Sequence, residues 1–108
     1  MVKPDPDLIA SKMVSLVELG APRDFRDLHA FCQAGLATPQ ECWQLWAQRQ
    51  QKDGSDTDPY RARLAVETHL MRICLHRPLE SIVEPDRRAE AERVRSWFEE
   101  EFLHAVLD

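Results

Sequence analysis

Hydrophobic residues recur along the chain at intervals of three and four positions, the period of a helix with one buried face. In the first such run, Ile9, Met13 and Leu16 follow a start rich in proline and aspartate, which can cap a helix. We therefore predict a helix over about residues 7 to 19. Gly20 stands where helices commonly end in the left-handed conformation, so a tight corner should follow.

Pro22 suits the first turn of a second helix, and Gly35 marks the end of that helix. The stretch Thr38-Pro39-Gln40-Glu41 is a capping box, in which the threonine hydroxyl and the glutamate carboxylate satisfy free backbone amides. A third helix begins there. We expect it to lose regularity in the polar run 48–52 and to give way to the most mobile segment, a loop at 53–57.

A fourth helix is predicted over about residues 59 to 76, because Asp58-Pro59 repeats the start signal and Pro78 disfavours helical geometry just before it. One helical turn is expected over 78–83. The side of the fourth helix that we expect to be buried comprises Tyr60, Leu64, the side from Val66 to Leu70, Met71, Ile73 and Leu75.

Pro85 opens a long final helix, in which Trp97, Phe98 and Phe102 keep the helical period. Its length suggests that one end protrudes or packs against a second copy of the chain. No segment shows the strict alternation of a strand. We predict an all-α fold, a single domain over residues 1–108 formed by a compact bundle of five main helices and one short additional helical turn.

The composition of the chain argues against several classes of function. The length of 108 residues fits one domain, and the net charge of -5 argues against binding to nucleic acid. Arginines near residues 61–77 and 87–95 are interleaved with acids, as on solvated helix faces. Three cysteines without CxxC spacing and four histidines without a metal-binding pair predict no metal site. We expect a cytoplasmic protein without membrane contact, because no signal peptide or long apolar run is apparent.

Candidate chemistry is concentrated in the first two predicted helices. Asp24 and Asp27 lie three positions apart, where two carboxylates can bind a metal or orient a hydroxyl. Acids in a first turn also complement the helix dipole, and spacing alone favours that structural interpretation. Arg23 and Arg26 can grip a phosphate, although pairing with neighbouring acids is the default. Lys12 can reach a phosphate as a point charge, but without a partner site it is a solvated lysine.

From Lys12 to Trp46 the order of residues resembles the helical C-terminal lobe of AbiEii-type nucleotidyltransferase toxins, from bacterial toxin-antitoxin and abortive-infection systems. That lobe carries a lysine on one helix and then an Arg-x-x-Asp-like stretch followed by Asp-Leu. Lys12 is similar to the lysine, and Arg23-Asp24-Phe25-Arg26-Asp27-Leu28 is similar to the acidic motif. The resemblance implies catalytic roles for Asp24 and Asp27 and nucleotide binding by Lys12, Arg23 and Arg26.

In this family a catalytic lobe with a Gly-Ser phosphate turn and two metal-binding acids precedes the helices, and the present sequence has no such motifs. The resemblance thus implies a free-standing helical lobe, inactive alone, that acts with a separate N-terminal nucleotidyltransferase lobe or an antitoxin. The completed enzyme would use Mg²⁺ and a nucleoside triphosphate.

Two alternatives belong to other classes. The first is a non-catalytic helical interaction or scaffold protein, a homodimer through the final helix with Trp97 and Phe102 in the interface. The second is a DNA-binding helix-turn-helix at the Gly35 corner, which the acidic balance disfavours.

Overall fold

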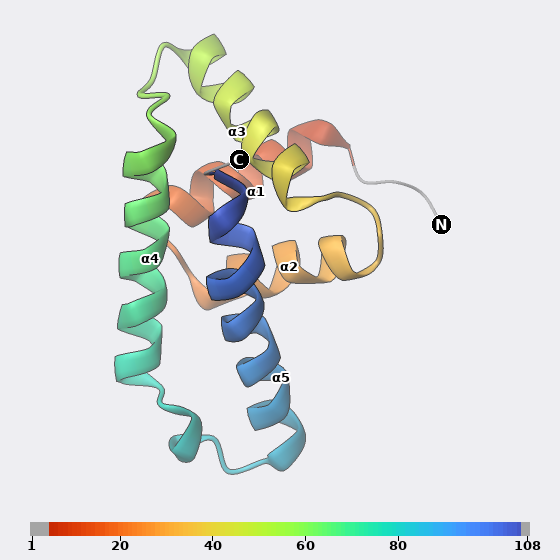
Figure 1. The fold of residues 1–108 in the computed structure, drawn as a ribbon, viewed down its shortest axis with the longest axis vertical. Helices are drawn as coiled ribbons and strands as arrows, with labels where there is room; N and C mark the ends of the chain where they lie inside the picture. The colour runs from red at the N-terminus through yellow and green to blue at the C-terminus, as the bar shows by residue number, and fades with distance from the viewer. Residues whose placement is uncertain (1–4, 107–108) are drawn as a thin grey trace.

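The computed structural model describes residues 5–106 and contains helices and turns, with no strand in that range (Figure 1). The five main helices are α1 (Pro6–Glu18), α2 (Pro22–Gln33), α3 (Pro39–Asp53), α4 (Pro59–His76) and α5 (Pro85–Trp97). A 3-10 turn, η1 (Leu79–Ser81), links α4 to α5. Beyond α5 the chain continues as a π-helical turn, η2 (Phe98–Phe102), and a 3-10 turn, η3 (Leu103–Val106). The prediction of an all-α bundle is confirmed.

Helix α1 lies at the centre of the bundle and packs against α2, α3 and α4. The far ends of α4 and α5 extend beyond the other three helices, where η1 joins them (Figure 1). One hydrophobic core receives side chains from all five helices and from η2 and η3. Its largest fully buried members are Phe98, Phe102, Ile9, Met13, Leu16, Leu28, Val66 and Cys42.

Local start signals explain where the helices begin. Each of the five has proline in its first turn, where the missing amide hydrogen costs nothing. The Thr38 hydroxyl accepts a hydrogen bond from the Glu41 amide at 3.1 Å, so the threonine half of the predicted capping box is present. Asp58 caps α4 in the same way through the Tyr60 amide at 3.0 Å.

The third helix is longer than the hydrophobic pattern predicted. Instead of losing regularity at 48–52, α3 continues to Asp53 and ends at Gly54, whose φ of 68° gives a left-handed cap. The run 48–52 is polar, but glutamine, arginine and lysine are good helix formers, so the helix outlasts its apolar stripe.

Helix α4 buries a narrower side than predicted. Tyr60, Leu64, Met71 and Leu75, all expected in the core, are exposed. The packed side is formed instead by Ala62, Val66 and Leu70, with Ile73 partly buried against the core. Apolar residues surround α4 on more than one side, so their spacing does not determine which side meets the other helices.

The aromatic residues of the final helix lie inside the bundle. Trp97 and Phe102 are buried within one chain, and the indole Nε1 of Trp43 donates a hydrogen bond to the Phe102 carbonyl at 3.1 Å. A dimer in which these two rings form an exposed face is therefore not available to the folded chain. Any self-association must use other residues.

Candidate functional site

A tight corner at Gly20 brings α1 and α2 together. Gly20 has φ of +61°, and its amide donates to the Ser15 carbonyl at 3.1 Å, the bond of a left-handed helix cap. From α4, His69 packs against this corner, with its Nε2 3.0 Å from the Val17 carbonyl oxygen. Arg72 Nη2 donates to the Leu19 carbonyl at 3.1 Å. The end of α1 is thus held by side chains from α4.

Next to this corner, three of the predicted site residues form one cluster. Lys12 Nζ on α1 lies 2.6 Å from Asp27 Oδ2 and 3.7 Å from Asp24 Oδ1 on α2. The Ser15 hydroxyl donates to Asp24 Oδ2 at 2.7 Å. Asp24 is buried, whereas the side chains of Lys12 and Asp27 are 21% and 37% exposed. The cluster is therefore accessible from solvent through Lys12 and Asp27.

This geometry replaces two interpretations made from the sequence, that Asp24 serves only its own helix and that Lys12 is a solvated lysine. Asp24 directs its carboxylate toward α1, to Lys12 and Ser15, so its contacts reach beyond the first turn of its own helix. Lys12 is a paired cation and not a solitary solvated lysine. Within residues 5–106 the ion pairs of Asp24 and Asp27 are made by Lys12, and no ion pair of Arg23 or Arg26 with them is present.

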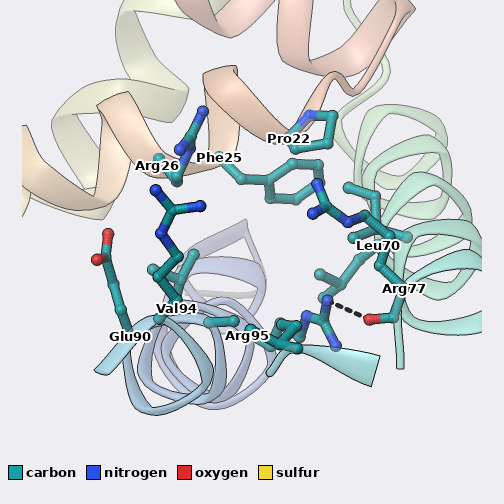
Figure 2. A pocket seen from close by; sticks show the side chains of 12 residues that line it. Pro22, Phe25, Arg26, Leu70, Arg77, Glu90, Val94 and Arg95 are labelled. Atoms are coloured by element: carbon teal, nitrogen blue, oxygen red, sulfur yellow. Dashed lines mark hydrogen bonds between the residues drawn. The ribbon is translucent and has the colours of Figure 1, made fainter. Parts of the chain in front are cut away.

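The two arginines are set apart from the cluster. Arg23 is exposed on α2. Arg26 lines a pocket between α2, α4 and α5, together with Arg77, Arg87 and Arg95 (Figure 2). The sequence pattern assigned the last three to solvated helix faces. No local signal could have identified this pocket, because its arginines come from α2, from α5 and from the end of α4.

The cluster has a defined chemical capacity. One ammonium faces two carboxylates, so the three groups together carry a single negative charge. A hydrogen bond to an ionised carboxylate, such as that from Ser15 to Asp24, contributes about 1.5–3 kcal/mol. No group of three or more His, Cys, Asp or Glu side chains in the described part of the chain is placed to hold a metal ion.

Two cysteines form a second contact that the sequence did not reveal. Cys32 at the end of α2 is half-buried, and Cys42 on α3 is buried. A hydrogen bond from the Cys42 thiol lowers the pKa of Cys32, and the same contact together with burial raises the pKa of Cys42. Cys32 is therefore the more reactive of the pair.

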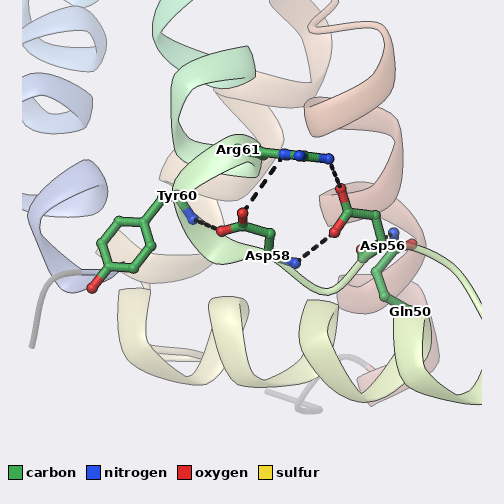
Figure 3. Close-up of polar contacts among 5 residues, drawn as sticks. All are labelled: Gln50, Asp56, Asp58, Tyr60 and Arg61. Atoms are coloured by element: carbon green, nitrogen blue, oxygen red, sulfur yellow. Dashed lines mark hydrogen bonds and ion pairs between the residues drawn. The ribbon is translucent and has the colours of Figure 1, made fainter.

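The connection between α3 and α4 carries charged side chains with local partners. Arg61 Nη1 lies 3.4 Å from Asp56 Oδ2, and Arg61 Nε lies 3.7 Å from Asp58 Oδ2 (Figure 3). Asp56 also accepts from the Asp58 amide at 2.9 Å, and its carbonyl accepts from Gln50 Nε2 at 2.8 Å. These contacts close the turn and start α4. The mobility expected for this segment stays a prediction.

Comparison of the chain with protein-family models, with curated proteins and with solved structures gives no significant match. Among the residues that the structure covers, no helix combines the length and apolar character needed to cross a membrane. Function must therefore be argued from the site itself.

Proposed function

We propose that this chain is the helical lobe of a nucleotidyltransferase and acts with a separate α/β lobe. The observation that carries the proposal is the convergence of Lys12, Asp24 and Asp27, from two helices, on one partly exposed cluster. Asp24 is the one buried charged residue among residues 5–106. Buried ion pairs rarely improve stability over apolar packing, so this choice of residue types favours a role beyond holding α1 to α2.

Each residue has a distinct role in the proposed complex. Lys12 exchanges Asp27 for a phosphate oxygen of a nucleoside triphosphate held by the partner lobe, which leaves the Asp27 carboxylate free to accept a proton from the attacking hydroxyl. Asp24, fixed by Ser15, keeps Lys12 oriented. Arg23, exposed on the same helix, is available to the triphosphate. We assign the metal-binding acids to the partner lobe, so this chain alone is inactive.

Reconstitution tests the proposal. The chain is co-expressed with a candidate α/β nucleotidyltransferase lobe, and the purified mixture is assayed for a complex and for magnesium-dependent transfer of labelled nucleotide. Lys12→Met should retain the complex and abolish transfer, while Lys52→Met, which changes the exposed lysine near the end of α3, should retain both. Transfer by the isolated chain, equal transfer by both variants, or absence of any complex would each overturn the proposal.

A second candidate function, a self-associating helical interaction protein, is favoured by the outer side of α4. Tyr60, Leu64, Met71 and Leu75 are 61–75% exposed and lie on one side of the helix. Their positions are symmetric about the middle of α4, between Glu67 and Thr68. When two copies of α4 pair in antiparallel orientation, Tyr60 of each copy therefore meets Leu75 of the other, and Leu64 meets Met71.

The area is sufficient for a specific contact. If each of these partly exposed side chains contributes roughly 120 Å², two copies bury about 1,000 Å² in total, near the lower limit for a specific interface. At the centre, Glu67 is already paired with Arg63 at 2.9 Å, which limits repulsion between the two glutamates. We therefore commit to a second copy of this chain as the occupant of this surface.

Sedimentation velocity over a range of protein concentrations distinguishes this candidate. The unmodified chain should dimerise, Leu64→Glu should be monomeric, and Val83→Glu should dimerise normally because Val83 is an exposed apolar residue away from α4. A chain that stays monomeric at the highest concentration, or a dimer that Leu64→Glu leaves intact, excludes α4 as the interface.

A further inference from the structure

The arginine pocket carries an inference that is independent of the Lys12 cluster. We propose that the pocket between α2, α4 and α5 binds a small phosphomonoester with an apolar body. The cavity has a volume of about 330 Å³, within the size range of small-molecule sites. It is lined on one side by α2 and on the other by α5 and the end of α4 (Figure 2).

Charge is the first argument for an anionic ligand. Arg26, Arg77, Arg87 and Arg95 face a single acid, Glu90, around one cavity, although the whole chain has a net charge of -5. A positive pocket on an acidic protein concentrates the local field and draws anions to that point on the surface. Excess positive charge at this density is costly without a counter-ion, and a bound anion removes that cost.

The guanidinium groups of this pocket are also available to a ligand. Arg95 Nη2 donates to the Arg77 carbonyl at 2.7 Å, which fixes α5 to the end of α4. Arg87 makes a long, exposed contact of 3.4 Å with Glu84. The guanidinium groups of Arg26 and Arg77 make no hydrogen bond or ion pair in the described part of the chain. Figure 2 shows Arg26 on α2 and Arg77 at the end of α4, on either side of Phe25.

The floor of the pocket is apolar and favours a ligand with an apolar body joined to its phosphate group. Phe25, Leu70 and Val94 are buried core residues whose side chains line the cavity, and Ile73 and Ala91 add further apolar surface. Inorganic phosphate would leave this floor uncovered. A phosphate group joined to an aromatic or aliphatic body would pair with the guanidinium groups and cover the floor.

The arginines form the rim of the pocket, and a phosphate group suits them better than a single carboxylate. Guanidinium groups bind phosphate oxygens in a bidentate manner, and a phosphomonoester near neutral pH carries almost two negative charges. The enclosed floor and the limited volume also favour a small molecule over a nucleic-acid backbone, which needs an extended basic surface.

Calorimetric titration with 1-naphthyl phosphate tests the proposal, with inorganic phosphate and 1-naphthol as the two half-ligands. We expect 1-naphthyl phosphate to bind at least about 10-fold more tightly than either, because it uses both the rim and the floor. Raising the salt concentration should weaken its binding. Binding no tighter than that of inorganic phosphate would show an unspecific anion effect and would overturn the proposal.

Variants locate the site. Arg26→Gln and Arg77→Gln should each weaken binding by about 10-fold, the loss expected for one charge-assisted hydrogen bond. Arg93→Gln, which removes an exposed arginine of α5 outside the pocket, should bind normally. Ala91→Trp fills the cavity and should abolish binding while circular dichroism shows an unchanged helix content. Full affinity in Ala91→Trp, or equal losses in all three arginine variants, would refute the assignment.

Discussion

Substitution of Gly20 by alanine should be the most damaging glycine change in the molecule. All three glycines have positive φ, at 61° for Gly20, 74° for Gly35 and 68° for Gly54. Alanine in this conformation costs about 1–2 kcal/mol at each position. Only at Gly20 does the added Cβ also meet another side chain, because it would lie 2.2 Å from Cγ of His69. No atom lies within 4 Å at the other two.

The overlap adds a second cost. Relief requires His69 to move away from the Val17 carbonyl, and overpacking of this kind costs about 1–3 kcal/mol in addition to a hydrogen bond worth about 1 kcal/mol. We expect Gly20→Ala to lower the free energy of unfolding by about 3–6 kcal/mol, against about 1–2 kcal/mol for Gly35→Ala.

Urea denaturation followed by circular dichroism measures these differences. Combining Gly20→Ala with His69→Ala should restore part of the loss, since the second change removes the obstructing ring. If Gly20→Ala costs no more than Gly35→Ala and Gly54→Ala, the close approach of α4 to the corner is not a determinant of stability, and the reasoning is wrong.

Three further predictions concern ionisable groups. Lys12→Met should destabilise the fold by about 1–3 kcal/mol in chemical denaturation, because buried Asp24 loses its cation; an unchanged midpoint would contradict this. Burial lowers the pKa of His29 below 6.5, so the unfolded chain binds more protons just below that pH. Stability should therefore fall as the pH drops from 6.5 through the folded pKa, and His29→Gln should flatten that part of the profile; an unaltered profile argues against it. Iodoacetamide should alkylate Cys32 well before Cys42 near neutral pH, as mass spectrometry of digested protein can show, and the reverse order would be inconsistent with their contact.

The fold was largely predictable because the signals that start and end its helices are local. Proline in the first turn and capping residues act within a few positions of one another, so the start of α4 at Pro59 could be placed from the sequence. The buried side of α4 could not, since Leu64 and Val66 are equally apolar and only the position of the other helices decides which is covered. The full length of α3 was not predicted, because residues with high helix propensity continue after the apolar pattern of the helix has ended.

The candidate site shows the same division. The order of Lys12, Asp24 and Asp27 pointed to residues that the fold brings within ion-pair distance. Ser15 was missed, although it lies three positions after Lys12 and thus on the same side of α1. The sequence pattern placed Arg77, Arg87 and Arg95 on solvated helix faces and did not indicate a shared pocket, because their proximity arises from packing between distant segments.

The closing of α1 by His69 and Arg72 has a consequence for the order of events during synthesis. The two contacts span 52 and 53 positions of the sequence. A nascent chain emerging from its N-terminus carries Lys12 and both aspartates long before these side chains exist. The first helix can form early, but its terminal turn gains its lasting partners only after α4 has emerged. A nascent chain whose emerged part ends within α3 should therefore display these N-terminal residues on a corner that still frays, and emergence of α4 should protect the amides of that corner from hydrogen exchange.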